Sequence, residues 1–168
     1  QDGKKDIIQI SGKKLSYNNY NDLYSALAIT KMFPKNKGTA IIKHANPCGV
    51  SINSNKLRSF KEALESDPLS AYGGIISCNF KLNFNLAKEV NKTFFEVIVA
   101  NGFDKKSINL LKNKTKLRLI DSSKLDRNLK YNFLSKFNSI LVQSADNINF
   151  SKKDFKVVSK EKPNKKTL

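Results

Sequence analysis

Several residue types are scarce in this chain, and each scarcity narrows the range of possible functions. The 168 residues contain one histidine, two cysteines and no tryptophan. A zinc site needs three or four ligands, so one histidine and two separated cysteines are a poor supply. Cys48 and Cys78 form neither a C-x-x-C pair nor a disulfide-rich spacing. We therefore expect no metal site and a reduced, cytoplasmic setting.

Long apolar runs and several familiar motifs are also missing. No apolar run approaches the roughly 18 residues that a membrane-spanning helix needs. The opening stretch QDGKKDIIQI lacks the apolar region of a signal peptide. Neither a P-loop nor a G-x-G-x-x-G fingerprint occurs. We therefore expect no membrane attachment and no nucleotide site of these two kinds.

Acidic residues are few relative to basic residues, which gives a net charge of +17. Such an excess invites the interpretation of a nucleic-acid-binding module. The excess is almost all lysine, however, because the arginines are only Arg58, Arg118 and Arg127. Sequence-specific recognition of base edges in the major groove depends largely on the two parallel hydrogen bonds that an arginine guanidinium can donate. We favour a solvated basic surface without a nucleic-acid partner, and keep a basic nucleic-acid-binding module as an alternative function.

Short apolar runs alternate with segments of helical periodicity, and 39% of the residues are hydrophobic, which is enough for a core. The alternation predicts an α/β layered fold with a largely parallel sheet. We expect one lobe over residues 1–168, with a polar, flexible tail at 160–168. The expected strands are residues 6–10, 38–43, 74–80, 95–100, 116–120, 139–146 and 155–159. The expected helices are residues 22–33 with Asn21 as N-cap, 57–66, 84–94, and a short one capped by Asp104.

Two loops carry most of the residues suited to chemistry. One is KHANPCG, residues 43–49, after the expected strand 38–43; the other is DPLSAYGG, residues 67–74, before the expected strand 74–80. Ligands of open α/β sheets gather at the carboxyl ends of the strands, so we expect both loops there. Paired glycines let backbone N–H groups approach a ligand closely, although a plain turn also explains them.

Lys43 and His44, the sole histidine, are the strongest candidates for catalysis. A fixed cation favours the neutral imidazole, which can accept a proton, and the same cation can stabilise a developing oxyanion. A lysine at a strand end and a hydrogen-bonded loop histidine remain the alternative. Adjacent residues of a regular strand point to opposite faces, so both can serve one site only if the strand ends at Lys43. Cys48 could act as a nucleophile activated by His44, but we favour the alternative that it is a small, buried hydrophobic residue.

Four stretches carry a resemblance to a known family: SGKKLSYNNYNDLYSALAI, AIIKHANPCGV, DPLSAYGGII and FFEVIVA. In this order and approximate spacing, they resemble the bacterial AICAR transformylase region, the formyl-transferring part of a bifunctional purine-biosynthesis enzyme that also contains IMP cyclohydrolase. The resemblance runs from about residue 7 to the end. It implies a three-layer α/β/α sandwich that is cytidine-deaminase-like but lacks the zinc site.

The resemblance also implies a reaction and roles for four residues. The amino group of AICAR would attack the formyl carbon of the cosubstrate 10-formyltetrahydrofolate, with His44 as proton acceptor and Lys43 as transition-state stabiliser. Gly73 and Glu96 would bind the nucleotide substrate. The family also implies a homodimer with active sites at the subunit interface.

Three departures from the family pattern affect these expectations. Tyr72 stands where the family has phenylalanine, which should be tolerated if the ring only packs. The family's upstream RYGENPHQ element and its downstream half do not occur in this sequence. We therefore expect the sequence to be a fragment, from the first half of the transformylase part, that is inactive or nearly so alone. A non-catalytic structural lobe is a further alternative.

Overall fold

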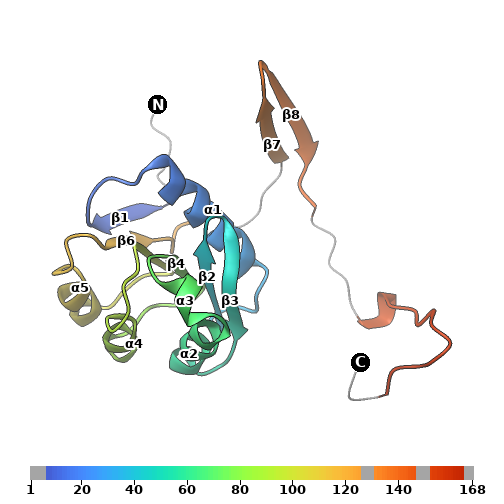
Figure 1. Cartoon of the computed structure of the whole chain (residues 1–168), viewed down its shortest axis with the longest axis horizontal. Coiled ribbons are helices and arrows are strands. Elements are labelled where there is room, and N and C mark those ends of the chain that lie inside the picture. Colours follow the sequence, from blue (N-terminus) through green and yellow to red (C-terminus); the bar gives the residue numbers. More distant parts are fainter. Residues whose placement is uncertain (1–6, 126–130, 147–151, 165–168) are drawn as a thin grey trace. The chain divides into compact units, whose positions relative to one another are not determined.

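The computed structural model describes residues 7–125, 131–146 and 152–164. The chain divides into two compact units, residues 1–127 and residues 128–168 (Figure 1). Each unit is described by itself. The expectation of a single lobe over residues 1–168 stays a prediction.

One mixed β-sheet forms the centre of the first unit. Among its described residues, the strands lie in the order β1-β6-β5-β4-β2-β3. β4, β5 and β6 are parallel, whereas the β1–β6, β4–β2 and β2–β3 pairs are antiparallel. The parallel part of the expected sheet is therefore limited to its middle. The strands are β1 Ile8–Ser11, β2 Gly38–Lys43, β3 Asn46–Ile52, β4 Ile75–Cys78, β5 Val97–Ala100 and β6 Arg118–Asp121.

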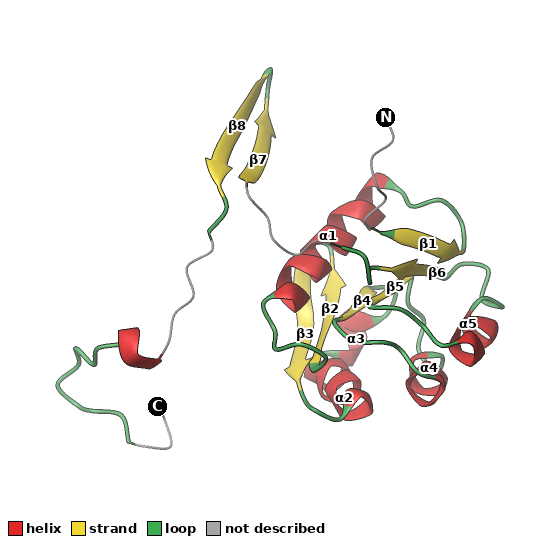
Figure 2. Cartoon of the chain, turned by 180° about the vertical axis from the view of Figure 1, so that it is seen from behind, coloured by secondary structure: helices red, strands yellow, loops and turns green. Residues whose placement is uncertain are grey.

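Helices cover both faces of this sheet, which confirms the expected α/β sandwich (Figure 2). Alternate strand residues point to opposite faces, so Ile42, Ile75 and Val97 pack toward α1. Their neighbours pack on the other face in a cluster that includes Phe60 and Leu86 of two further helices. The helices are α1 Tyr17–Lys31, α2 Lys56–Ser66, α3 Pro68–Ala71, α4 Phe84–Val90 and α5 Lys105–Leu111.

Helix α1 begins earlier than the sequence pattern indicated. We expected residues 22–33 with Asn21 as N-cap, but the cap is Ser16. Ser16 and Asn19 form a capping box, in which Ser16 Oγ accepts from the Asn19 backbone N–H at 3.2 Å and Asn19 Oδ1 accepts from the Ser16 N–H at 3.2 Å. The first turn of α1 is polar, so it lacks the apolar period on which the expected start was based.

Strand β3 lies where the sequence predicted only a loop. Pro47 and Gly49 disfavour a central strand, but β3 is at the edge of the sheet, where proline is tolerated. The β2–β3 register shifts between Ile41 and Ile42, which leaves an extra residue on β3 as a bulge. Gly49 also allows the edge to approach α2, because a Cβ atom there would lie 1.8 Å from the Ala63 carbonyl oxygen.

The second unit contains a two-stranded hairpin, β7 Tyr131–Lys136 and β8 Ser139–Ser144. Every residue of both strands is exposed. A short 3-10 helix, η1, follows at Lys152–Asp154. The expected strand at 155–159 is wrong, because those residues form no ladder. Of the expected tail at 160–168, residues 165–168 lie outside the described residues.

Among the helices of the described residues, none combines the length and apolar character that crossing a membrane requires.

Candidate active site

The antiparallel placement of β2 brings distant parts of the chain to one edge of the sheet. Ile42 of β2 pairs with Ile75 at the start of β4, and Ile75 pairs with Val97 at the start of β5. The carboxyl end of β2 therefore meets the amino ends of β4 and β5. The expectation that both loops lie at carboxyl strand ends is wrong for the second loop, since an antiparallel neighbour reverses which ends meet.

His44 and Ala45 form the two-residue turn between β2 and β3. Both have positive φ, 53° and 60°, as a type I′ hairpin turn requires. Residues other than glycine adopt this conformation at a cost of roughly 1–2 kcal/mol each. The Ala45 backbone N–H donates to Asp22 Oδ1 of α1 at 2.7 Å, and Asn46 Nδ2 donates to the His44 carbonyl at 2.8 Å. These bonds hold the turn, and the His44 side chain is exposed.

Lys43 is the last residue of β2, and its ammonium group is held by the second loop. Nζ donates to the carbonyl oxygens of Tyr72 and Gly73 at 3.2 and 3.1 Å. Gly73 has φ +69°, and a Cβ atom there would lie 3.1 Å from Nζ. The glycine thus permits both the left-handed backbone and the close approach of the cation. An ammonium group has three donors, so two bonds leave one for an incoming oxygen.

Glu96 immediately precedes β5 and is held from two directions. Its Oε2 accepts from Asn19 Nδ2 at 2.9 Å, and Arg118 Nη1 lies 3.9 Å from the same oxygen. Asn19 is buried and also belongs to the capping box of α1. The start of α1 therefore orients the carboxylate that faces the end of β2.

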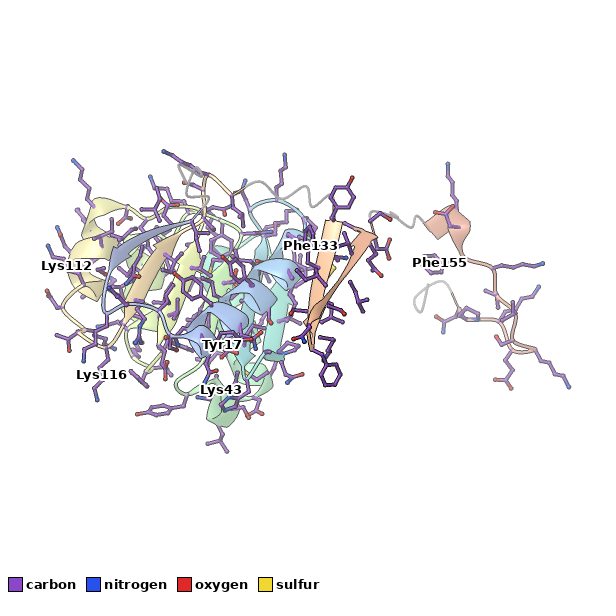
Figure 3. All side chains as sticks on the ribbon, turned by 90° about the horizontal axis from the view of Figure 1, so that it is seen from above. Tyr17, Lys43, Lys112, Lys116, Phe133 and Phe155 are labelled. Carbon is purple, nitrogen blue, oxygen red and sulfur yellow. The ribbon has the colours of Figure 1, made fainter. Side chains whose placement is uncertain are left out.

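One pocket of about 170 Å³ brings these residues together. All four residues that the sequence singled out, Lys43, His44, Gly73 and Glu96, line it. Figure 3 labels Lys43 and also Tyr17, the first residue of α1. The sequence reasoning missed the other lining residues, which are Ser16, Asn18, Asn19, Asp22 and Ile75. A signal was present in the polar run SYNNYND, residues 16–22, but the asparagine-rich composition of the chain concealed it.

The pocket combines a cation, an imidazole, two carboxylates and side-chain amides, which suits a small polar ligand with both donors and acceptors. The imidazole can exchange a proton, the ammonium can stabilise an oxyanion, and the carboxylates can accept from hydroxyl or amino groups. Within the described part of the chain, no three histidine, cysteine, aspartate or glutamate side chains cluster as metal ligands would.

Cys48 lies outside this pocket. Its thiol is half-buried, donates to the Ile41 carbonyl at 3.5 Å and packs against the core. Burial raises the pKa of the Cys48 thiol, which disfavours the thiolate that a nucleophile needs. The structure therefore favours the packing interpretation of Cys48.

Tyr72, the residue that departs from the family pattern, is an exposed ring beside the pocket. Its centroid lies 5.4 Å from that of Phe94 in a tilted arrangement. The pair places two aromatic faces next to Gly73, in keeping with a ring that packs rather than reacts.

Comparisons with known proteins bear on this arrangement. The family model described as AICARFT/IMPCHase bienzyme matches residues 1–168. The bifunctional purine biosynthesis protein PurH of Buchnera aphidicola subsp. Acyrthosiphon pisum (strain Tuc7) is 41% identical over 162 residues, which are 95% of this chain and 31% of the relative. PurH of Thermoanaerobacter sp. (strain X514) is 35% identical over 166 residues, 99% of this chain and 32% of the relative. The chain thus spans about a third of the length of these curated relatives.

A solved structure from Desulfotalea psychrophila, described as a formate dehydrogenase accessory protein, shares the fold alone. Its TM-score is 0.50 at 12% sequence identity, and the match covers 76% of this chain and 56% of that one.

Proposed function

Because the chain belongs to the AICARFT/IMPCHase bienzyme family, we propose that it supplies part of an AICAR transformylase active site. The reaction is formyl transfer from 10-formyltetrahydrofolate to the 5-amino group of AICAR, a step of purine biosynthesis. One observation carries the proposal: Lys43, His44, Gly73 and Glu96, from three separate segments, line one pocket. The proposed fold is cytidine-deaminase-like without the zinc.

The proposed mechanism assigns one task to each of two side chains. The aminoimidazole amine is a weak nucleophile and the formamide carbon a weak electrophile. As the new C–N bond forms, His44 accepts the amine proton while Lys43 balances the charge on the formyl oxygen. The bond to the folate nitrogen then breaks, and the proton goes to that leaving nitrogen, which gives formyl-AICAR and tetrahydrofolate.

The geometry supports these two tasks. The strained turn holds His44 at the mouth of the pocket, exposed, so its imidazole can reach a bound amine. Lys43 is fixed by two carbonyls with a third donor left over. Gly73 and Glu96 complete the wall on the side where a nucleotide would lie.

The proposal extends to the longer protein. Since the chain spans 31% of its PurH relative, we propose that it works as part of a longer bifunctional, cytoplasmic enzyme with IMP cyclohydrolase, as a homodimer. The 168-residue chain alone should show little or no formyl transfer. A transformylase assay on the isolated chain tests this, and robust turnover would contradict it.

The role of His44 is tested by His44→Ala in the full-length protein. General-base help is worth about 10²–10⁴ in rate, so kcat should fall by that factor while KM for AICAR changes little. Ile52→Ala, an exposed change at the other end of the same hairpin, serves as control and should keep kcat. A folded His44→Ala protein with nearly normal kcat would refute the general-base role.

A further inference from the structure

A second pocket adjoins the candidate active site. It has a volume of about 230 Å³ and is lined by Lys13, Phe94, Glu96, Lys116 and Arg118. We call it the basic pocket. Glu96 also lines the first pocket, so one carboxylate forms part of both walls. A ligand that extends past Glu96 from Lys43 and His44 would enter the basic pocket.

The charges of the basic pocket do not cancel. The pocket has three cations and one carboxylate. Of the three cations, only Arg118 lies within ion-pair distance of Glu96, with 3.9 Å between Nη1 and Oε2. Among the described residues, no carboxylate forms an ion pair with the ammonium groups of Lys13 or Lys116. The pocket therefore has an excess of two positive charges, which attracts an anion of about that charge.

Arg118 gives this pocket a fixed element. Its side chain is only 15% exposed, and Nη1 donates to the Lys116 carbonyl at 3.1 Å. Its Nε is buried and has no hydrogen-bond partner among the described atoms. A guanidinium that is held in place and incompletely paired stabilises a charged acceptor nearby.

Phe94 supplies the apolar wall. Its ring centroid lies 5.4 Å from that of Tyr72, and the same ring is close to Gly73 of the first pocket, so this apolar wall continues toward the candidate active site. An extended ligand could cover these rings with a carbon framework and place charged oxygens beyond them.

We infer that the basic pocket binds the anionic end of a substrate whose reacting end lies at Lys43 and His44. The ligand group is an oxyanion, either the 5′-phosphate of the nucleotide or the glutamate carboxylates of the folate. This inference rests on the proposed function for the identity of the substrates, but not for the binding of an anion.

The test uses the full-length protein with Lys116→Gln and Lys13→Gln, both at exposed positions, and Arg118→Lys as a charge-conserving change. Lys112→Gln is the matched control (Figure 3). Lys112 is an exposed lysine at the end of α5 that does not line the basic pocket, so its substitution removes the same charge elsewhere on the surface. Circular dichroism confirms that each variant is folded.

Equilibrium binding is measured for AICAR, for its nucleoside without the phosphate, for tetrahydrofolate and for its analogue without the glutamate. A lost charge-assisted hydrogen bond should raise the Kd about tenfold. If the phosphate is the bound group, Lys116→Gln weakens the binding of AICAR and leaves the binding of the nucleoside unchanged. If the glutamate carboxylates are the bound group, Lys116→Gln weakens the binding of tetrahydrofolate and leaves the binding of the analogue without the glutamate unchanged.

Competition by inorganic phosphate and by free glutamate separates this inference from the proposed function. Weaker competition by either anion in Lys116→Gln than in Lys112→Gln supports the pocket, even if His44→Ala retains full activity and the proposed function fails. Equal binding of every ligand by all variants would overturn the inference. So would an equal loss in Lys112→Gln, which would show a general surface charge instead of a site.

Discussion

At the scale of single residues, the backbone decides how closely side chains can approach the candidate site. Gly73 adopts φ +69° beneath the Lys43 ammonium, and His44 adopts φ 53° at the hairpin turn. The first position uses the freedom of glycine, whereas the second relies on hydrogen bonds from neighbouring residues. Two of the non-glycine residues with positive φ, His44 and Ala45, thus lie in the turn at the pocket.

Gly49→Ala should strongly destabilise the first unit. The added Cβ would lie 1.8 Å from the Ala63 carbonyl oxygen, so the β3 edge and α2 would have to separate. We expect a loss of at least about 3 kcal/mol, the upper range for overpacking, by urea unfolding. Gly102→Ala is the control, since its nearest contact would be the Lys81 side chain at 3.9 Å and only its φ of +90° opposes the change. Equal losses in the two variants would contradict the steric argument.

Cys78 should resist thiol reagents in the native protein. Burial raises the pKa of Cys78 to about 12, so almost no thiolate is present at neutral pH. We expect labelling with iodoacetamide to proceed at Cys78 only when the chain unfolds, and more slowly than at half-buried Cys48 under native conditions. Peptide mass spectrometry after timed labelling measures both rates. Rapid native labelling of Cys78 would show that the core of β4 opens easily.

At the scale of elements, side-chain caps fix where the helices begin. A polar side chain accepts from the backbone at the start of each described α-helix, and the caps are Ser16, Asn55, Asp67, Asn83 and Asp104. At α1 the cap also reaches the candidate site, because Asn19 links Ser16 to Glu96. Capping is therefore part of the way the pocket is built.

Asp104 is the cap whose removal should matter most for stability. It accepts from Ser107 N–H of α5 at 2.6 Å and from Phe84 N–H of α4 at 2.9 Å. The hydrogen bond from the Ser107 backbone, with others, holds the pKa of this carboxyl below its usual range. Asp104→Ala should cost about 1–2 kcal/mol at neutral pH.

The pH dependence of this cost follows from the direction of the pKa shift. A lowered folded-state pKa contributes stability above the unfolded-state pKa of about 4, and this contribution is lost as pH falls through the folded-state value. The difference between wild type and Asp104→Ala should therefore shrink below pH 4 in thermal unfolding. Asp104→Asn retains an acceptor without the charge and should show less of this pH dependence. A difference that is constant with pH would argue against a charged cap.

At the scale of the whole molecule, the two units differ in how they are stabilised. The first has apolar clusters on both faces of its sheet. The hairpin of the second exposes large apolar side chains instead, such as Phe133 at 69% and Ile140 at 68%. An isolated two-stranded hairpin is at best marginally stable in water.

Hydrogen exchange on the 168-residue chain should reveal this difference. Amides of β7 and β8 should exchange within about tenfold of unfolded rates, because a marginal hairpin opens readily. Amides of Ile76 and Ile98 in the sheet should be protected by at least about a thousandfold, as expected for a domain stable by 5 kcal/mol or more. Comparable protection of the hairpin and the sheet would show that the hairpin has a stabilising contact in this chain.

Local pattern predicted much of the first unit. Continuous apolar runs marked β2 and β4, and the apolar period of residues 57–66 marked α2, because burial on a sheet or a helix face imposes those repeats. The pattern failed at β3, where Pro47 and Gly49 serve an edge strand, and at the polar first turn of α1. The first turn of α1 carries no hydrophobic repeat, and the short alternation of Cys48, Val50 and Ile52 in β3 was outweighed by Pro47 and Gly49.

The sequence by itself determined the types of most elements and the adjacency of Lys43 and His44, since both depend on neighbours along the chain. Only the tertiary structure decided that β2 runs antiparallel to β4, and therefore that Lys43 meets Gly73 and Glu96 at the amino ends of β4 and β5. Buried strands show the same apolar run whichever way their partners point. Strand direction is set by long-range hydrogen bonding and packing, which no local repeat encodes.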